Sequence, residues 1–355
     1  MAASPPRVAA ITPNWLGDIV MALPALRGLA SALSGRTPPE SLDVWTPRPL
    51  ASLVAALVPR AEVLPFDLGR GAITRFRWRL RLARQMRAHA YRAVAMFPNS
   101  FGSALVAWRA GVPERIGTPL HSRGMLLTKK VEPQGATEHL SKAYLRLAAE
   151  AAGTGLEVEG ADASLALPDG VRSSARAILA EAGLGKDEAF VAMAPGAAYG
   201  PAKQWGAVNF AAVARLIAKG VSARDSGAAT VVVGTSADSE AAAEIARRAD
   251  GARVVDMTGR TDLLELAGVI SLGKGFVGND SGAAHLAGAL GVPTVAVYLS
   301  TDPVRTGQRG KSVRLVAADT EFRPCMRRRC PQGHYRCREA VTPQIVMQAL
   351  AEAGG

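Results

Sequence analysis

Short apolar segments rich in valine, isoleucine and alanine recur along the chain, and longer stretches with helical periodicity separate them. Short apolar runs bounded by turn residues indicate buried strands, whereas apolar positions three or four residues apart indicate helices. The alternation predicts repeated β–α units, which build parallel sheets covered by helices. In the first half we expect a helix over residues 18–33 and strands over residues 8–12, 42–45, 63–66 and 93–97. In the second half we expect strands over residues 190–194, 229–233, 253–256, 275–277 and 294–298.

One arginine-rich stretch is ambiguous. Between residues 76 and 82, apolar side chains alternate with arginines at period two, which by itself indicates a strand. The length of the stretch and its continuation to His89 favour a helix, and we expect a helix here.

The best boundary between domains lies in residues 151–170, which are rich in glycine and acidic residues and end in Pro168-Asp169-Gly170. We therefore expect an α/β protein with two Rossmann-like domains, residues 1–168 and 169–355, facing a central cleft. Neither half contains a G-x-G-x-x-G fingerprint or a Walker A loop, so a dehydrogenase and a P-loop enzyme are both disfavoured.

Composition agrees with a globular protein of two domains. The chain has 355 residues, of which 48% are hydrophobic and 20% are charged, a balance unlike that of disordered proteins. No apolar run reaches the roughly 20 residues that cross a bilayer, and the first ten residues lack the layout of a signal peptide. We expect a cytoplasmic protein with no transmembrane segment.

The positive charge is unevenly distributed. The formal net charge is +12, and the segment between Asp67 and Glu114 contains nine arginines and no acidic residue. Such a surface attracts polyanions, which include a phosphorylated glycolipid, an anionic membrane leaflet and nucleic acid. The alternative is a solvated basic helix that only aids solubility.

The first chemical motif follows the first expected strand as residues 14–21, NWLGDIVM. Ligands of open α/β sheets bind at the carboxyl ends of the strands, where Gly17 and Asp18 fall. A carboxylate at Asp18 can accept the proton of a sugar hydroxyl as that oxygen attacks. The alternative is that Asp18 caps the following helix.

A glycine-rich loop follows the first expected strand of the second half as residues 195–205, PGAAYGPAKQW. Backbone N–H groups in such a loop, which includes Gly196, can hold a phosphate, and Lys203 can add positive charge for a departing diphosphate. The alternative is an ordinary loop with a surface lysine.

Residues 278–285, GNDSGAAH, open another expected helix. Ser281 and Gly282 fall at its start, where unpaired N–H groups and the helix dipole favour a bound diphosphate. Asp280 would repel that diphosphate, so we expect it to orient the loop, cap the helix or contact another part of a donor. His285 is a weaker candidate, because a lone histidine in a helix is more often a packed residue.

Two further loops give weaker signals. Residues 258–263 connect an expected strand to a helix, and Thr261 there can contact a nucleoside through its hydroxyl group. Residues 234–240 follow another strand in the same way.

Together these segments resemble the ADP-heptose:lipopolysaccharide heptosyltransferases, glycosyltransferase family 9, over nearly the whole chain, and within that family the heptosyltransferase II group. The motifs that carry the resemblance are residues 14–18 with Met21, 97–100, 110–113 with Arg115 and Gly117, 195–205, 279–285, and 300–303 with Thr306. One position departs from the family pattern. Gly206 follows Trp205 where the family often has proline, a change that can loosen the start of the next helix.

The resemblance implies a GT-B fold and an inverting transfer, without metal or other cofactor, of heptose from ADP-heptose to the inner-core heptose of lipopolysaccharide. In that family the aspartate matching Asp18 is the proposed base, the lysine matching Lys203 helps to hold the diphosphate, and residues 280–285 contact the donor. The acceptor is a phosphorylated lipid A–core at the inner membrane surface, so the arginine-rich window gains a partner. The C-terminal domain would bind the donor nucleotide and the N-terminal domain the acceptor.

Three cysteines and a histidine cluster near the C-terminus, at Cys325, Cys330, His334 and Cys337. They match the ligand set of a Cys₃His zinc site, although their spacing is irregular. A reducible disulfide and free thiols are the alternatives, and neighbouring arginines would lower the thiol pKa values. We do not expect this cluster to be the active site.

Two rival functions remain open. One is a related glycosyltransferase that uses another sugar nucleotide or acceptor. The other is a non-enzymatic protein that binds polyanions, suggested by the basic composition and disfavoured because it leaves the loop motifs unexplained and no nucleic-acid-binding module is recognisable. We expect no nucleic acid among the partners.

Overall fold

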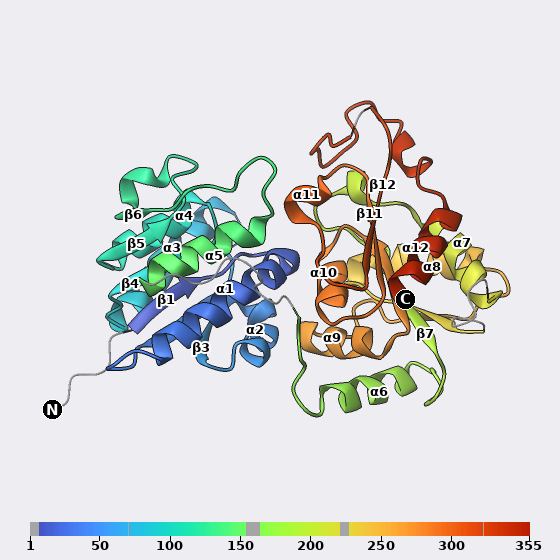
Figure 1. The fold of residues 1–355 in the computed structure, drawn as a ribbon, viewed down its shortest axis with the longest axis horizontal. Coiled ribbons are helices and arrows are strands. Elements are labelled where there is room, and N and C mark those ends of the chain that lie inside the picture. The colour runs from blue at the N-terminus through green and yellow to red at the C-terminus, as the bar shows by residue number, and fades with distance from the viewer. Residues whose placement is uncertain (1–6, 70, 154–163, 221–226, 322) are drawn as a thin grey trace. The chain divides into compact units, whose positions relative to one another are not determined.

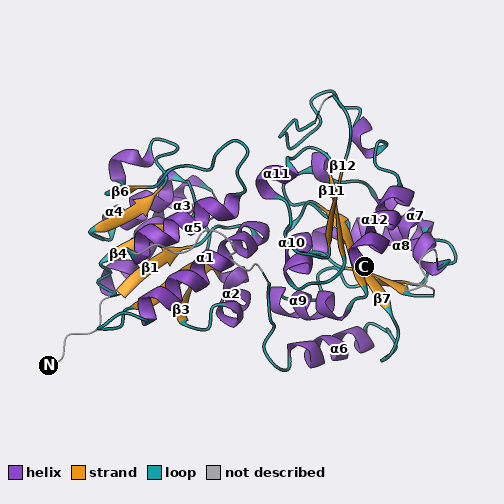
Figure 2. Ribbon diagram, in the orientation of Figure 1, coloured by secondary structure: helices purple, strands orange, loops and turns teal. Residues whose placement is uncertain are grey.

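The computed structural model describes residues 7–69, 71–153, 164–220, 227–321 and 323–355, apart from the side chains of residues 72, 73 and 75. Arg70 and the side chain of Arg75, both counted in the basic window, therefore lie outside the described part. The chain divides into two compact units, Met1–Ala163 (unit 1) and Ser164–Gly355 (unit 2). Residue 168, where the sequence placed the domain boundary, falls in unit 2. Each unit has a parallel six-stranded sheet with helices packed against it (Figures 1 and 2).

Unit 1 follows the expected β–α alternation. Its sheet has the strand order β3-β2-β1-β4-β5-β6. The strands are β1 (Arg7–Ile11), β2 (Ser41–Pro47), β3 (Ala61–Phe66), β4 (Ala93–Met96), β5 (Glu114–Gly117) and β6 (Lys129–Lys130). The helices are α1 (Leu16–Ser34), α2 (Ala51–Leu57), α3 (Ala72–Ala88), α4 (Phe101–Arg109) and α5 (Leu140–Ala152), with the short 3₁₀ turns η1 (Arg48–Leu50) and η2 (Arg123–Leu126).

Unit 2 repeats the same plan with the order β12-β11-β10-β7-β8-β9. Its strands are β7 (Phe190–Ala194), β8 (Ala229–Val232), β9 (Val254–Asp256), β10 (Gly275–Asn279), β11 (Thr294–Tyr298) and β12 (Val313–Ala317). Its helices are α6 (Val171–Glu181), α7 (Ala207–Ala218), α8 (Ser239–Arg248), α9 (Leu263–Leu272), α10 (Gly282–Ala289), α11 (Pro303–Thr306) and α12 (Pro343–Gly354). The 3₁₀ turns are η3 (Pro201–Lys203), η4 (Ser236–Asp238) and η5 (Arg336–Arg338).

The pattern analysis located nine strands correctly and missed β5, β6 and β12. β5 and β6 are short and carry charged residues, and β6 and β12 are edge strands. An edge strand is covered on fewer sides than a central one, so it needs no continuous apolar run. β6 and β12 therefore lack a continuous apolar run, and β5 lacks one because it is short and carries charged residues.

The arginine-rich stretch is a helix, as expected, and forms α3. Leu82 and Met86 are buried, four residues apart, and pack with β-sheet residues in the core of unit 1. Trp78, one turn earlier, packs against the same core. This spacing buries one helical face. Arg81 and Arg84 are exposed, whereas Arg79 is half-buried beside Gly102 of α4.

Among the described helices, α1 alone is long and apolar enough to cross a membrane. A core helix can meet the same criteria of length and composition, and most of α1 is buried inside unit 1. Its buried residues include Ile19, Leu23, Leu26 and Leu29, and it packs on α5. The apolar composition of α1 thus fits its position between the sheet and a second helix.

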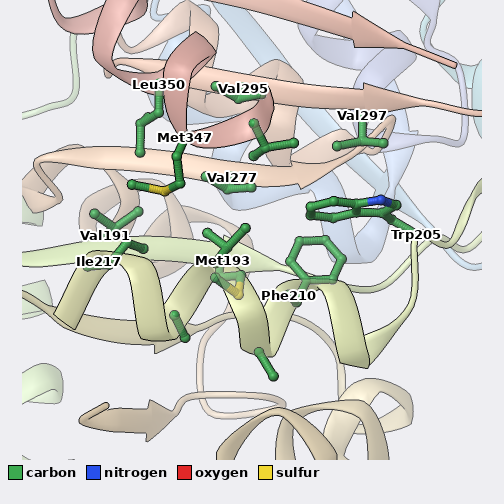
Figure 3. Close-up of a cluster of buried hydrophobic side chains, with 14 of the residues drawn as sticks. Val191, Met193, Trp205, Phe210, Ile217, Val277, Val295, Val297, Met347 and Leu350 are labelled. Atoms are coloured by element: carbon green, nitrogen blue, oxygen red, sulfur yellow. The ribbon is translucent and has the colours of Figure 1, made fainter. Parts of the chain in front are cut away.

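The core of unit 2 lies between the sheet and the helices α7 and α12 (Figure 3). Val191, Met193 and Val277 of the central strands meet Phe210 of α7. Trp205 is fully buried at the edge of this cluster, and its indole donates a hydrogen bond to the carbonyl of Val341 at 2.9 Å. The end of the loop that follows β7 is therefore anchored in the core.

Candidate active site

Each sheet has a switch point where the chain changes its direction of travel across the sheet. In unit 2 the chain runs from β7 outward to β9 and then returns to β10 on the other side of β7. In unit 1 it does the same at β1 and β4. The loops that leave two such neighbouring strands diverge, and ligands of open α/β sheets bind in the space between them. The motifs around Asp18, Lys203 and Asp280 all lie at these two switch points.

In unit 2, Asn279 fastens both ends of the loop after β7. Its side-chain nitrogen donates to the carbonyl of Pro195 at 2.6 Å, and its side-chain oxygen accepts from the backbone N–H of Trp205 at 2.9 Å. Asn279 is fully buried at the end of β10. It therefore ties residues 195–205 to the neighbouring strand, a role that sequence reasoning did not assign to it.

Lys203 and Asp280 form a salt bridge across the switch point. The Lys203 ammonium contacts Oδ2 of Asp280, and the Thr301 hydroxyl donates to the same oxygen at 2.6 Å. The Lys203 side chain is 14% exposed and that of Asp280 only 4%, so Lys203 is not an ordinary surface lysine. Burial by itself would raise the pKa of Asp280, but the Lys203 charge and the hydrogen bonds from Lys203 and Thr301 outweigh it and lower that pKa below its usual value.

Asp280 therefore orients Lys203 and the loop, one of the three roles expected for it, and it does not cap α10. The cap residue is Ser281, whose hydroxyl accepts from the backbone N–H of Ala284 at 3.4 Å. Gly282 is the first residue of the helix, as expected. His285 is buried, and its charge helps to lower the pKa of Asp280, which places the imidazole in the same electrostatic network.

Gly196 allows the loop after β7 to approach the loop after β8 closely. A Cβ at Gly196 would lie 2.3 Å from Oδ1 of Asp238, and a Cβ at Gly234 would lie 2.7 Å from its Oδ2. The Asp238 carboxylate accepts from the backbone N–H and the hydroxyl of Thr235 at 2.8 and 2.9 Å. Asp238 thus packs the loop after β8 against the loop after β7. Sequence patterns singled out residues 234–240 but not Asp238 itself.

Thr261 lies farther from the salt bridge. It is half-buried in the loop between β9 and α9, just before the cap residue Asp262. β9 is the second strand from β7, and a spacing of about 4.8 Å per strand sets the two strand ends roughly 10 Å apart. The loop is joined to the loop after β8 by a hydrogen bond from Gly259 N–H to the Gly234 carbonyl at 2.9 Å.

Gly206 occupies a conformation that proline cannot adopt. Its φ is +100°, whereas proline is fixed near −65°. The start of α7 is nevertheless held, because the Asn209 side chain donates to the Trp205 carbonyl at 3.0 Å. The departure from the family pattern thus changes the path of the backbone, and Asn209 secures the start of the helix.

In unit 1, Asp18 lies in the first turn of α1 and is half-buried. The cap position is Trp15, three residues earlier, so the interpretation of Asp18 as the cap residue is wrong. Gly17 is the second residue of the helix and is also half-buried. Burial and the Asp18 charge raise the pKa of Tyr144, a residue of α5. The helix dipole favours a carboxylate at this end.

The loop after β4, at the same switch point, is organised by a residue that the sequence did not reveal. The Arg123 side chain is fully buried. Its guanidinium donates to the Thr118 carbonyl at 2.7 Å, to the Asn99 side-chain oxygen at 3.0 Å and to the Pro98 carbonyl. Burial lowers the pKa of Arg123 to about 10. No ion pair of Arg123 with a carboxylate occurs among the described residues, so the acceptors of its hydrogen bonds are neutral oxygens.

The three cysteines are free thiols. Among the described residues, no three His, Cys, Asp or Glu side chains are grouped so that they could hold a metal ion, so the Cys₃His ligand set is not assembled. The pKa of Cys330 is lowered, as expected, but the cause is hydrogen bonding from backbone N–H groups, that of Tyr335 first, and not the neighbouring arginines. The cysteines lie in residues 323–338, which we call the C-terminal strap.

Comparison with known proteins agrees with this architecture. Residues 79–336 match the model of glycosyltransferase family 9 (heptosyltransferase). Lipopolysaccharide heptosyltransferase 2 of Salmonella typhimurium (strain LT2) is 28% identical over 97% of both chains. The structure of Escherichia coli ADP-heptose lps heptosyltransferase II aligns with a TM-score of 0.76 at 26% identity over 98% of both chains.

A second solved structure has the same fold. The E. coli heptosyltransferase WaaC with ADP aligns with a TM-score of 0.70 at 20% identity, over 98% of this chain and 99% of that chain. The two parallel six-stranded sheets are thus those of GT-B heptosyltransferases. Because the family model covers well over half of the sequence, this chain belongs to glycosyltransferase family 9 and is a heptosyltransferase.

Proposed function

We propose that this enzyme transfers L-glycero-D-manno-heptose from ADP-heptose to the inner-core heptose of lipopolysaccharide. The observation that carries the proposal is the buried Lys203–Asp280 pair beside the start of α10, at the switch point of unit 2. The relatives named lipopolysaccharide heptosyltransferase 2 support the acceptor, and the heptosyltransferase II structure supports the donor.

Unit 2 would bind the donor. Lys203 is held in place by Asp280, so its ammonium needs little reorganisation to receive a diphosphate oxygen. Backbone N–H groups at Ser281 and Gly282 open α10, and the helix dipole there favours the same negative charge. Both groups would stabilise ADP as its charge grows during departure. These groups are already oriented toward the phosphates, whereas water molecules would have to reorient as the charge on ADP grows.

Asp18 of unit 1 would act as the base. The acceptor hydroxyl oxygen attacks the anomeric carbon of ADP-heptose from the face opposite the leaving group. The new glycosidic bond forms, the bond to the ADP oxygen breaks with its electron pair, and the hydroxyl proton passes to the Asp18 carboxylate. The configuration at the anomeric carbon inverts in this single displacement. Protein groups alone carry out each step, so no cofactor takes part.

The decisive experiment measures ADP release from ADP-heptose with and without a monoheptosylated Kdo2-lipid A acceptor. We expect wild-type release to depend on the acceptor and Asp18→Asn to lower kcat at least a hundredfold, since general-base catalysis contributes about 10²–10⁴-fold. The Kd for ADP should not change. Asp67→Asn, which alters an exposed carboxylate of the same unit, is the matched control and should keep wild-type activity.

Acceptor-independent release alone would refute the heptosyltransferase II assignment and favour a relative with another acceptor. Turnover of a different sugar nucleotide at a higher kcat/KM would refute ADP-heptose as the donor. Wild-type activity of Asp18→Asn would remove Asp18 from the mechanism while leaving the transfer itself intact.

We also propose that the enzyme is cytoplasmic and attaches to the inner face of the inner membrane through the outer surface of α3 and α4. These helices are set closely together, because a Cβ at Gly102 of α4 would lie 2.6 Å from the Arg79 guanidinium of α3. The surface exposes Phe76 and Trp108, 51% and 49% exposed, among arginines. The exposed arginines are Arg77, Arg81, Arg84, Arg87 and Arg109.

Anionic lipid headgroups complement this charge, and aromatic rings favour the interfacial region of a bilayer. Sedimentation with vesicles of phosphatidylcholine, with and without phosphatidylglycerol, tests the proposal. Reversing Arg77 and Arg84 to glutamate should weaken binding to the anionic vesicles more than tenfold, because each basic residue near such a surface contributes about 1 kcal/mol. The control reverses the exposed Arg247 and Arg248 of unit 2. Equal loss in both variants, or equal binding to neutral vesicles, would contradict the proposal.

A further inference from the structure

The C-terminal strap bridges two loops on either side of the salt bridge. Its Met326 N–H donates to the Ser300 carbonyl at 2.7 Å, after β11, and its Arg328 carbonyl accepts from Ala202 N–H at 3.1 Å, after β7. β11 and β7 flank β10, which carries Asp280 at its end. The strap, the orange-to-red segment between β12 and α12 in Figure 1, is therefore attached beside both residues that contact Asp280, Lys203 and Thr301.

Side chains reinforce this attachment at both ends. Arg323 donates to the Thr301 carbonyl at 3.0 Å, and Arg338 donates to the Pro201 carbonyl at 3.0 Å. The Tyr199 hydroxyl donates to the Met326 carbonyl at 2.9 Å. Gly200 has a φ of +148°, and a Cβ there would lie 2.5 Å from the Arg328 carbonyl oxygen. The loop and the strap thus meet at a distance that only glycine permits.

This attachment places the Arg328 side chain at the Tyr199 ring, which Lys203 also contacts. The Arg328 guanidinium carbon lies 5.3 Å from the centroid of the Tyr199 ring, and the Lys203 ammonium lies 4.9 Å from the same centroid. The two cations are therefore at most about 10 Å apart. Both contacts are in the range of cation–π attraction, which helps to hold the two side chains on one aromatic platform.

The charges of the two cations differ in how they are balanced. Lys203 is paired with Asp280, which offsets part of its charge before a ligand binds. Arg328 is exposed, and no salt bridge of the described residues pairs it with a carboxylate. The Arg328 guanidinium is therefore a positive charge beside Tyr199 that none of these salt bridges offsets. A guanidinium also presents several N–H donors in a plane, which suits phosphate oxygens.

We propose that Arg328 is a donor-binding residue, which contacts one phosphate of the ADP diphosphate while Lys203 contacts the other. The inference rests on the proposed function, since it takes the donor to lie at the switch point of unit 2. It adds a role for the C-terminal strap, which fastens the loop through its backbone and supplies the unpaired positive charge through its side chain.

Isothermal titration calorimetry with ADP, AMP and adenosine tests the proposal on the full-length enzyme. We expect Arg328→Ala to raise the Kd for ADP about tenfold, to affect AMP less and to leave adenosine unchanged. Arg328→Lys should recover part of the loss. The matched control is Arg329→Ala, which removes the same charge from the next exposed position of the strap and should change the Kd for ADP less than threefold.

The Arg328→Ala variant keeps the backbone carbonyl that fastens Ala202, so the strap should remain attached. Hydrogen exchange of strap peptides checks this. An unchanged Kd for ADP in Arg328→Ala, or an equal loss in Arg329→Ala, would overturn the proposal, the second outcome indicating a diffuse field in place of a contact. If the wild type binds ADP but does not transfer heptose, the proposed function fails and the Arg328 contact is still measured. If transfer proceeds and Arg328→Ala binds ADP normally, only the Arg328 inference fails.

Discussion

The switch points of the two units share one topology and differ in how they treat charge. In unit 2, the largely buried ammonium of Lys203 contacts the buried carboxylate of Asp280 directly. In unit 1, Asp18 is half-buried on the first turn of a helix, while the buried Arg123 is surrounded by neutral oxygens. The same strand order therefore positions an ion pair in unit 2 and a buried arginine among neutral oxygens in unit 1.

This difference suits the two tasks proposed for the units. A leaving diphosphate is best stabilised by groups that are already oriented, and a buried ion pair keeps Lys203 oriented before the donor arrives. A base must exchange a proton with its substrate, so its carboxylate must remain accessible, and Asp18 is only half-buried. The buried Arg123 fixes the loop after β4 through hydrogen bonds to neutral oxygens.

The largest effect on this comparison should come from breaking the pair in unit 2. Asp280→Asn leaves the Lys203 cation without its partner in a site where the side chain is 14% exposed. Removing one partner of a buried pair costs about 3–5 kcal/mol, and we expect a loss of this size in the free energy of unfolding of unit 2. Guanidinium denaturation measures it, with hydrogen exchange of β7 and β10 peptides assigning the transition to unit 2.

The double variant Asp280→Asn/Lys203→Met should recover more than half of that loss, because it leaves no unpaired charge. Glu244→Gln, which alters a half-buried carboxylate with exposed arginine partners in the same unit, should change the stability much less, because salt bridges with exposed partners contribute little. The pH dependence gives an independent check. The pKa of Asp280 is lowered in the folded state, so its stabilisation is present above the ordinary pKa near 3.8 and is lost as the pH falls through the lower folded value. The difference between wild type and Asp280→Asn should therefore shrink on acidification, and a constant difference would contradict the ion pair.

Sequence patterns predicted most of the fold because buried parallel strands require apolar runs. Residues 190–194 and 294–298, for example, coincide with β7 and β11. The strand Val313–Ala317 was not predicted, since an edge strand is half-covered and its single arginine, Arg314, breaks the apolar run. A fully buried strand can therefore be predicted from its apolar run. The pairing of an edge strand cannot, because it depends on a neighbouring strand that is distant along the chain.

The candidate site was predicted in part. The sequence singled out Lys203 and Asp280 through the loops that carry them, but it did not predict that they contact each other, because the contact depends on β7 and β10 being adjacent. Asn279 was part of a motif without an assigned role, and its function follows only from the two loop ends that it joins. The attachment of the C-terminal strap to the loop after β7 was equally hidden, since those partners lie more than a hundred residues away in the chain.

Arg123 offers the complementary test in unit 1. Arg123→Met removes the donors to Pro98, Asn99 and Thr118 and leaves their oxygens unpaired in a buried site. Unpaired buried groups cost about 1–3 kcal/mol each, and the release of a buried charge offsets part of this cost. We expect a net loss of roughly 2–3 kcal/mol in the free energy of unfolding of unit 1, smaller than the loss from breaking the pair in unit 2. Arg109→Met, at an exposed arginine of α4, is the control.

The kinetic consequence separates a positioning role from a purely structural one. If Arg123 fixes the loop after β4 for the acceptor, Arg123→Lys should raise the KM for the acceptor while the Kd for ADP stays at the wild-type value, because lysine retains the charge but lacks the planar set of donors. Asp280→Asn should do the opposite and weaken ADP binding with little effect on the KM for the acceptor. Equal effects of both variants on the two ligands would mean that the switch points are not specialised, and the charge difference between the units would then reflect stability alone.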